Sequence, residues 1–205
     1  MNNELDIKVC GMRQAQNIRD VEALGIDMMG FIFWPHSSRF VSQKPDYLPS
    51  NCKRVGVFVD EDLTAVRRHI EEYQLDMVQL HGHESPQYAS QLGGVTVVKA
   101  FNIATADDFR QTEAYEGICQ LFLFDTKGRS VGGNGEQFDW TVLSSYRGTT
   151  PFLLSGGIGP DDAEKVRQLC HPMLAGIDLN SRFELSPALK DSEALRAFIA
   201  ALRNK

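Results

Sequence analysis

Short, nearly continuous apolar runs recur along the chain and alternate with longer segments of mixed polarity. The runs are rich in Val, Ile, Leu and Phe, and they begin roughly 20 to 30 residues apart, the size of a strand with a helical return. Runs of this kind are typical of parallel strands that are covered on both faces. They occupy residues 5–10, 28–33, 54–59, 77–81, 96–101, 120–125, 151–155 and 174–179.

The segments between the runs carry the spacing of amphipathic helices. Residues 62–75 place apolar side chains three or four positions apart behind Asp62, a residue type that caps helices. Helices are also expected over 12–25, which ends on glycine, over 159–170, where Pro160 occupies a first-turn position, and over 192–205. Eight such strand–helix units predict an α/β fold, a single (β/α)8 TIM barrel domain over residues 1–205. The alternative is an open doubly wound sheet, but no GxGxxG follows the first strand.

Composition and charge narrow the class of protein further. The chain has 205 residues, 42% hydrophobic content and a formal net charge of −6, so a large core is expected and a basic nucleic-acid-binding face is not. No membrane span or secretory signal is recognisable, and we expect a cytoplasmic protein. Four cysteines without regular spacing favour a reducing compartment.

Two strand ends carry candidate acid–base groups. Asp125 ends the run LFLFD, where it would serve either as a loop or helix cap or as a general acid with a raised pKa. Cys10 ends the first run and is either a buried apolar side chain or a thiolate, which requires a lowered pKa and a nearby cation. Lys8 shares the strand face of Cys10. If it points inward it needs a carboxylate, and Asp178 on the neighbouring last strand is the predicted partner.

Other strand ends carry candidate binding groups. Gly156 and Gly157 after the seventh run, and residues 178–184 after the eighth, are suited to bind an anion, because loops in these positions of such barrels often form a phosphate site. Arg39, in the loop after the second run, is either a surface residue or a bidentate ligand of a carboxylate. His81 and His83, in the HGH segment, are not accompanied by an acidic cluster with the spacing of metal ligands, so no metal is expected.

Seven segments, taken in order, resemble the phosphoribosylanthranilate isomerase family of tryptophan biosynthesis over nearly the whole chain. They are KVCG (8–11), GFIFWPHSSRFV (30–41), RVGVFVDE (54–61), VQLHGHE (78–84), LFLFDT with GGNGEQFDW (121–140), SGGIGPDDA (155–163) and GIDLNSRFE with ALKD (176–191). Members of this family perform an Amadori rearrangement of a phosphorylated sugar and use neither a metal nor an organic cofactor.

The resemblance implies a role for each candidate residue. Cys10 would be the general base and Asp125 the general acid, while Arg39 would bind the anthranilate carboxylate. His81 would lie in the pocket wall, and the phosphate would lie along Gly156, Gly157, Asn180 and Ser181. The expected partner is a small phosphorylated substrate, with no nucleic acid and no membrane, and the chain is expected to act as a monomer or homodimer.

The chain departs from the family pattern at several positions. Ser38 stands where proline is common, Glu136 where lysine is common, and Arg182 where glycine is common. SGGI at 155–158 replaces the usual AGGL. The change at Glu136 reverses a charge in the glycine-rich loop, and the change at Arg182 adds one beside the predicted phosphate site.

Two alternatives remain open at this stage. The chain could be another phosphosugar isomerase on the same fold, or a relative that uses catalytic lysines, for which Lys99 is the available residue. It could also be a non-catalytic barrel that binds a phosphosugar. The second alternative needs the phosphate loops but not both Cys10 and Asp125, so the presence of both favours an enzyme.

Overall fold

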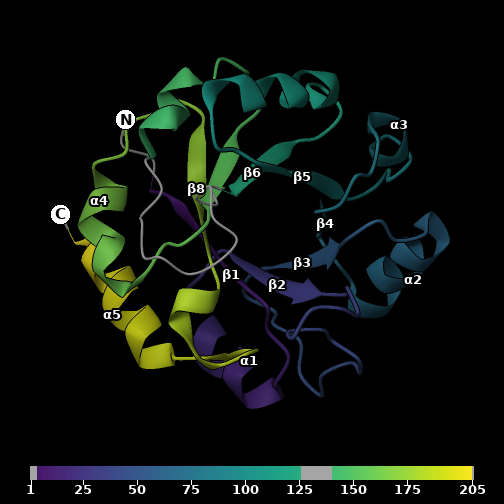
Figure 1. The fold of residues 1–205 in the computed structure, drawn as a ribbon. Helices are drawn as coiled ribbons and strands as arrows, with labels where there is room; N and C mark the ends of the chain where they lie inside the picture. Colours follow the sequence, from purple (N-terminus) through teal and green to yellow (C-terminus); the bar gives the residue numbers. More distant parts are fainter. Residues whose placement is uncertain (1–3, 126–139, 205) are drawn as a thin grey trace.

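Eight parallel strands close into a barrel, as the alternation of apolar runs predicts. The computed structural model describes residues 4–125 and 140–204. In Figure 1 the strands lie at the centre of the molecule and the helices surround them. In chain order the strands are β1 (Asp6–Cys10), β2 (Met28–Ile32), β3 (Lys53–Phe58), β4 (Met77–Leu80), β5 (Thr96–Asn102), β6 (Leu121–Asp125), β7 (Phe152–Ser155) and β8 (Leu174–Leu179).

Apolar side chains pack on both sides of the barrel wall. The outer side, between strands and helices, carries the larger cluster, which includes Ile7, Phe58, Phe122 and Phe124. The smaller cluster comes from the inward-facing positions of the strands, which are Met28, Val55, Met77, Val98, Ala100, Leu121, Leu123 and Leu153. Burial on both sides explains why the strands are almost continuously apolar in sequence. Among the described residues, the buried polar side chains of the interior, which include Lys8, Gln79, Asp125 and Asp178, lie in the middle or at the carboxyl end of their strands, and a site can form there.

Helices cover the outside of the barrel. The α-helices are α1 (Ala15–Glu22), α2 (Leu63–Tyr73), α3 (Pro86–Ala89), α4 (Ala163–Arg167) and α5 (Ser192–Arg203), and the 3₁₀ helices are η1 (Ala106–Tyr115), η2 (Trp140–Ser145), η3 (Pro160–Asp162) and η4 (Ser181–Phe183). The predicted cap of α2 is confirmed, because the Asp62 carboxylate accepts a hydrogen bond from the Thr64 amide at 2.8 Å.

The helical returns are shorter and less regular than the sequence pattern predicts. The helix expected over 12–25 begins only at Ala15, and the one expected over 159–170 divides into η3 and α4. The return between β2 and β3, residues 33–52, contains no helix, so the prediction of eight complete strand–helix units is wrong here. Pro45 and Pro49 explain the difference, because each removes an amide donor and disfavours helical geometry in the residue before it.

A short hairpin that the sequence pattern did not predict lies between β8 and α5. Its strands are β9 (Glu184–Ser186) and β10 (Leu189–Lys190), which pair antiparallel. The pairing places Glu184 opposite Lys190. Ala188, in the turn, has a φ of +66°. The hairpin thereby positions a carboxylate and an ammonium group beside the loop that follows β8.

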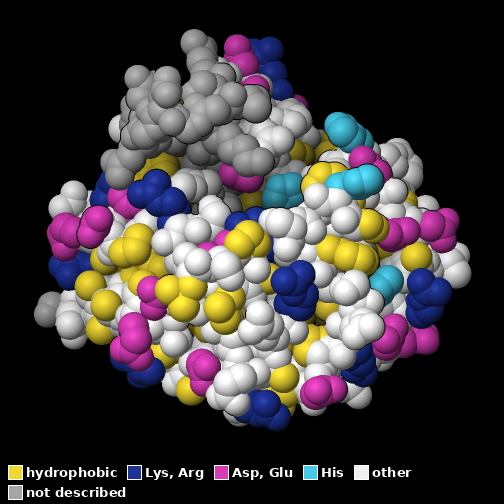
Figure 2. Space-filling view, turned by 60° about the horizontal axis from the view of Figure 1, so that its bottom comes forward, with side chains coloured by type: hydrophobic (Ala, Val, Ile, Leu, Met, Phe, Trp, Pro, Cys, Tyr) yellow, Lys and Arg dark blue, Asp and Glu magenta, His cyan; other side chains and the backbone are white. Residues whose placement is uncertain are grey.

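The molecular surface mixes charges of both signs. On the face shown in Figure 2, basic and acidic side chains alternate over the described residues without gathering into a broad patch of one sign. All four cysteines are free thiols, and Cys170 is the exposed one. In the part of the chain that the structure describes, no helix is both long enough and apolar enough to cross a membrane.

Candidate active site

A buried ion pair between β1 and β8 lies in the barrel interior. Lys8 and Asp178 are partners in the strand register, and Nζ of Lys8 lies 2.7 Å from Oδ1 of Asp178. The Lys8 side chain is 1% exposed. The Ser155 hydroxyl donates to the other carboxylate oxygen of Asp178 at 3.2 Å. The predicted pairing of Lys8 with Asp178 is therefore confirmed, and it places a positive charge two residues before Cys10, on the same face of β1.

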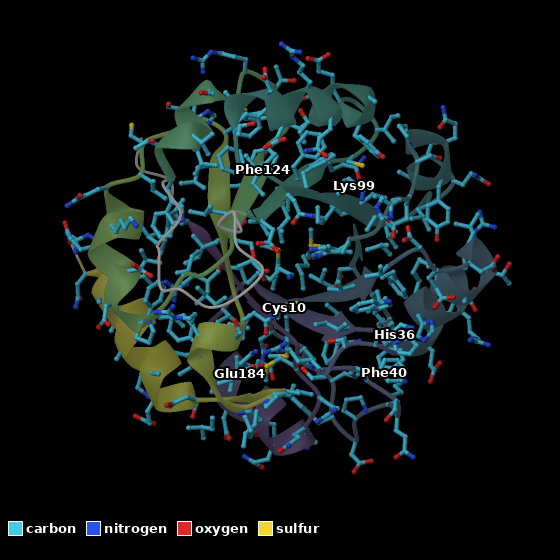
Figure 3. The ribbon with its side chains drawn as sticks, in the orientation of Figure 1. Cys10, His36, Phe40, Lys99, Phe124 and Glu184 are labelled. Atoms are coloured by element: carbon cyan, nitrogen blue, oxygen red, sulfur yellow. The ribbon has the colours of Figure 1, made fainter. Side chains whose placement is uncertain are left out.

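The thiol of Cys10 faces inward at the carboxyl end of β1. The residue is buried and lies near the centre of the barrel in Figure 3. Gly30 is its partner in register on β2, and a Cβ atom at that position would lie 2.6 Å from Sγ of Cys10. The glycine on β2 therefore leaves the space that the sulfur atom occupies.

Of the two roles left open for Cys10, the thiolate requires a lowered pKa. Burial raises the pKa of the Cys10 thiol above its ordinary value, and the positive charge of Lys8 opposes this shift without cancelling it. The lowered pKa that a thiolate would require is therefore not found in the free protein, because desolvation outweighs the cation. Burial would also lower the pKa of Lys8, but the Asp178 carboxylate raises it, so the ammonium group stays charged beside the thiol.

Asp125 faces inward from the end of β6. It is the register partner of Asn102 on β5 and Ser155 on β7, and the preceding inward positions, Leu121 and Leu123, belong to the interior cluster. The expected sharing of one face by residues 121, 123 and 125 is confirmed. The carboxyl group is buried, with Oδ2 lying 3.9 Å from Nε2 of His81. The glycine-rich loop that follows, including Glu136, lies outside the described residues.

The two histidines of the HGH segment have different surroundings. Nδ1 of His81 lies 2.8 Å from Nε2 of Gln79, which is fully buried on β4. Assigning the Gln79 amide as the donor to Nδ1 puts the proton of a neutral His81 ring on Nε2, the nitrogen nearest Asp125. His83 is exposed and pairs with Asp60 at 3.1 Å. Across residues 4–125 and 140–204, no group of three or more His, Cys, Asp or Glu side chains is arranged to hold a metal ion.

Arg39 reaches the carboxyl end of the barrel from the loop after β2 and makes a two-point contact with Glu184. Its Nε lies 2.8 Å from Oε1, and its Nη2 lies 2.6 Å from Oε2. Lys190 binds the same carboxylate, with Nζ 2.6 Å from Oε1. Sequence reasoning missed Glu184 and Lys190. Both lie in the segments FE and ALKD that carried the resemblance, but only the hairpin brings them together.

The loops after β7 and β8 lie next to each other, as predicted for an anion site. Gly156 and Gly157 have φ values of +94° and +74°, a conformation that favours glycine. Arg182 contacts this loop, because its guanidinium nitrogens would lie 3.2 Å from a Cβ atom built at Gly159. Asn180 precedes η4, and its side-chain oxygen accepts from Lys190 at 2.7 Å. The Asn180 oxygen is thus engaged within the protein, while the arginine adds positive charge beside the glycines.

Lys99 does not belong to this site. It lies in register with Leu80 and Phe122, which face away from the interior, and Figure 3 shows it toward the outside of the barrel. Its ammonium group binds Glu84 at 3.1 Å and the Gly82 carbonyl at 2.7 Å. A barrel enzyme that uses this lysine in catalysis is therefore not supported.

A hollow at the opposite end of the barrel contains none of the candidate groups. It lies before the starts of β2, β3 and β4 and is lined by residues that include Asp27, Cys52, Arg54 and Asp76. Its carboxylates already accept hydrogen bonds from the chain, Asp27 from the Ile7 amide and Asp76 from the Arg54 amide. The polar groups suited to acid–base chemistry are instead at the carboxyl end of the barrel.

Comparison with known proteins agrees with this geometry. The family N-(5'-phosphoribosyl)anthranilate (PRA) isomerase matches residues 7–201. The N-(5'-phosphoribosyl)anthranilate isomerase of Phocaeicola vulgatus is 49% identical over 201 residues, which cover 97% of this chain and 98% of the relative. The enzyme of the same name from Parabacteroides distasonis is 50% identical, covering 94% of this chain and 91% of its own.

A solved structure extends the similarity to three dimensions. It is a phosphoribosyl anthranilate isomerase in complex with reduced 1-(o-carboxyphenylamino)-1-deoxyribulose 5-phosphate. It superposes with a TM-score of 0.80 at 26% identity and covers 97% of this chain and 98% of its own. The match of family, sequence and fold extends over nearly the whole chain, which therefore belongs to the N-(5'-phosphoribosyl)anthranilate isomerase family.

Proposed function

We propose that this chain catalyses its family's isomerisation with Cys10 as general base and Asp125 as general acid. The reaction converts N-(5'-phosphoribosyl)anthranilate to 1-(2-carboxyphenylamino)-1-deoxyribulose 5-phosphate in tryptophan biosynthesis. One observation carries the assignment of the two residues. Both side chains face the interior at the carboxyl ends of strands, and β1 and β6 are separated in the closed barrel by β7 and β8. A sugar bound between them can lose a proton on one side and gain one on the other.

Asp125 suits the first step, in which the ribose ring opens. Its carboxylic acid would donate a proton to the ring oxygen, the bond from C1′ to that oxygen would break, and a protonated Schiff base would form. The carboxyl group is buried at the end of β6, where it can face the sugar with little competition from water. The nearby His81 imidazole, with its Nε2 toward the carboxyl group, can then stabilise the carboxylate that remains.

Cys10 suits the second step, in which the Schiff base loses its C2′ proton. The base must be a thiolate, and burial opposes its formation. Two cations offset this cost, since Lys8 is permanently beside the thiol and the Schiff base formed in the first step is itself positively charged. Transfer of the C2′ proton to sulfur gives an enolamine, and its tautomerisation to the ketone completes the isomerisation without any net change in composition.

The remaining candidate residues would hold the two ends of the substrate. The phosphate would bind to the loops after β7 and β8, with the amides of Gly156, Gly157, Asn180 and Ser181 as donors and Arg182 contributing charge. The anthranilate carboxylate would bind Arg39. Fixing both ends positions the reacting carbons between acid and base. We expect this chemistry to need neither a metal nor an organic cofactor.

The test is an assay with freshly prepared phosphoribosylanthranilate, following the loss of anthranilate fluorescence with and without a chelator. The wild-type chain should turn the substrate over equally in both. Asp125→Asn should keep the fold and lower kcat by about 10³-fold, because an amide cannot donate the proton. Wild-type turnover with an undiminished Asp125→Asn variant would remove Asp125 from the mechanism, and no wild-type turnover would contradict the proposed function itself.

The alternative of a barrel that only binds a phosphosugar is not favoured. It explains the anion-suited loops but gives no reason for a buried thiol and a buried carboxyl group to face the same interior. The expectations of a cytoplasmic location and of a monomer or homodimer stay predictions. Light scattering coupled to size-exclusion chromatography would measure the oligomeric state.

A further inference from the structure

We propose that Glu184 is a positioning residue that turns the guanidinium group of Arg39 so that its Nη1–Nη2 edge faces the carboxylate of the bound substrate. The inference rests on the proposed role of Arg39 and goes beyond it, because it assigns a function to a residue on the β9–β10 hairpin. The observation behind it is that the Glu184 carboxylate already binds one edge of the Arg39 guanidinium group, which is expected to bind the substrate.

The guanidinium group has two edges that can hold a carboxylate. Glu184 binds the edge formed by Nε and Nη2, at distances of 2.8 Å from Oε1 to Nε and 2.6 Å from Oε2 to Nη2. Among the described residues, Nη1 of Arg39 has no hydrogen-bond partner. The edge formed by Nη1 and the second proton of Nη2 therefore remains for a second planar carboxylate.

Glu184 is itself held rigidly. Its side chain is 5% exposed, and Oε1 also accepts from Nζ of Lys190 at 2.6 Å and from the amide of Ala188 at 3.2 Å. Lys190 is fully buried and donates in turn to the Asn180 side chain at 2.7 Å. Desolvation would raise the pKa of Glu184, but the hydrogen bonds from Arg39 and Lys190 lower it below its ordinary value, so the carboxylate is charged at neutral pH.

The arginine stem lies against the backbone next to the catalytic thiol. Gly11, which follows Cys10, has a φ of +81°, and a Cβ atom there would lie 2.6 Å from Cδ of Arg39. Figure 3 shows that Glu184 lies farther from the centre of the barrel than Cys10, on the side of α1 and α5. The direction of the guanidinium group is thus set by a glycine beneath it and a carboxylate beside it, and this direction fixes where the aromatic end of the substrate lies relative to the thiol.

The charge balance of this cluster favours one additional carboxylate. Arg39 and Lys190 contribute two positive charges, and Glu184 contributes one negative charge. An anthranilate group carries a single carboxylate, which would make the cluster neutral. A blocking role predicts the opposite behaviour, because a Glu184 that competed with the substrate for Arg39 would weaken its binding.

The decisive variant is Glu184→Gln, which preserves the shape of the side chain and removes the charge. We expect KM for phosphoribosylanthranilate to rise about tenfold, while kcat changes by less than about threefold, since a charge-assisted contact is weakened and the acid and base are untouched. For the analogue that carries aniline in place of anthranilate, KM should stay within about twofold of wild type. An unchanged or lower KM for the natural substrate, or an equal rise with the aniline analogue, would overturn the proposal.

A double-mutant cycle separates this inference from the role of Arg39. Arg39→Ala should raise KM, and in that background Glu184→Gln should raise it further by less than about twofold, because both residues serve one contact. Additive effects would contradict a positioning role. An unchanged KM in Arg39→Ala would instead remove Arg39 from the substrate site, and absent wild-type turnover would contradict the proposed function.

The matched control is Glu22→Gln, which alters another buried carboxylate at the opposite end of the barrel. Glu22 accepts from the amides of Ser50 and Asn51, both at 2.7 Å. This variant should lower the thermal midpoint without changing KM. If Glu184→Gln does not fold, Glu184→Asp tests the same role, because it keeps the charge but its shorter side chain cannot hold the guanidinium group in the same orientation. Its KM should also rise for the natural substrate only, and a KM within about twofold of wild type in both Glu184 variants would overturn the proposal.

Discussion

Two buried lysine–carboxylate pairs lie on opposite sides of the barrel wall. Lys8 binds Asp178 in the interior at 2.7 Å, and Lys99 binds Glu84 on the outer side at 3.1 Å. Each lysine lies near a buried cysteine, Lys8 near Cys10 and Lys99 near Cys119. In both cases burial raises the thiol pKa and the lysine partly opposes the shift, and the pKa of Cys119 is raised to about 11. Composition and burial therefore do not separate the pair beside the proposed base from the pair on the outer side of the wall.

What separates them is the set of acceptors around each ammonium group. Lys99 donates to Glu84 and to the carbonyls of Leu80 and Gly82, which ties the loop after β4 to β5. Lys8 donates to a single carboxylate oxygen of Asp178 and lies on the same strand face as a thiol at the mouth of the barrel. The outer lysine thus holds backbone carbonyls, whereas the positive charge of the inner lysine acts on the Cys10 thiol and opposes the rise of its pKa.

The largest expected effect comes from replacing the Cys10 thiol, which lies beside the inner lysine. Cys10→Ser should fold normally and lower kcat by about 10³-fold or more, because a hydroxyl group ionises at far higher pH than a thiol. Steady-state kinetics and circular dichroism measure the two properties. Turnover near the wild-type rate would show that the thiol is not the base. The inner pair would then have no catalytic role to distinguish it from the outer pair.

The next effect comes from removing the inner cation. Lys8→Met should lower kcat/KM by about 10- to 100-fold, since loss of an adjacent charge raises the thiol pKa by about one to two units. In a Cys10→Ser background the same change should have little further effect on turnover. An equal loss in both backgrounds would mean that Lys8 serves the structure alone.

The pH dependence of the rate sharpens the same point. A carboxylic acid ordinarily loses its proton well below a thiol, so the reactive form, with Asp125 protonated and Cys10 ionised, is a minority form at neutral pH. The profile of kcat/KM should be bell-shaped, and its high-pH limb should report the raised pKa of Cys10. In Lys8→Met this limb should move to higher pH while the plateau falls by the same factor. A falling plateau with an unmoved limb would contradict the proposed link.

The smallest effect on activity is expected for the outer pair. Lys99→Met leaves Glu84 buried without its cation, which should lower the free energy of unfolding by about 3–5 kcal/mol and the thermal midpoint by about 10 °C. The kcat of the folded protein should stay within about twofold of wild type. A loss of activity as large as that of Lys8→Met would contradict the assignment of a purely structural role to Lys99.

The predictable parts of this molecule are those in which each residue's environment follows from strand periodicity. The apolar runs located all eight strands, and alternation placed Lys8 on the strand face of Cys10 and Asp125 on the strand face of Leu121 and Leu123. Closure of the barrel then made β1 and β8 neighbours, which was sufficient to predict one ion pair across residues far apart in sequence.

The parts that could not be predicted depend on tertiary placement or on desolvation. The β9–β10 hairpin is too short to show a strand period, so the contact of Glu184 with Arg39 has no local signal. The helix-free return after β2 is a case in which turn residues override the expected alternation. The raised pKa of Cys10 is the sum of burial and an opposing charge, and a sequence reveals the charge but not the burial.

Gly30 sets a limit on how this barrel can diversify. At that position the inner wall has no side chain, and the sulfur atom of the neighbouring strand occupies the space. Even a methyl group there would overlap the sulfur atom of Cys10, the proposed base, so Gly30→Ala is a more severe change than its size suggests. Libraries that vary the barrel lining to seek new substrates should therefore leave this one codon fixed and place their diversity on the loops.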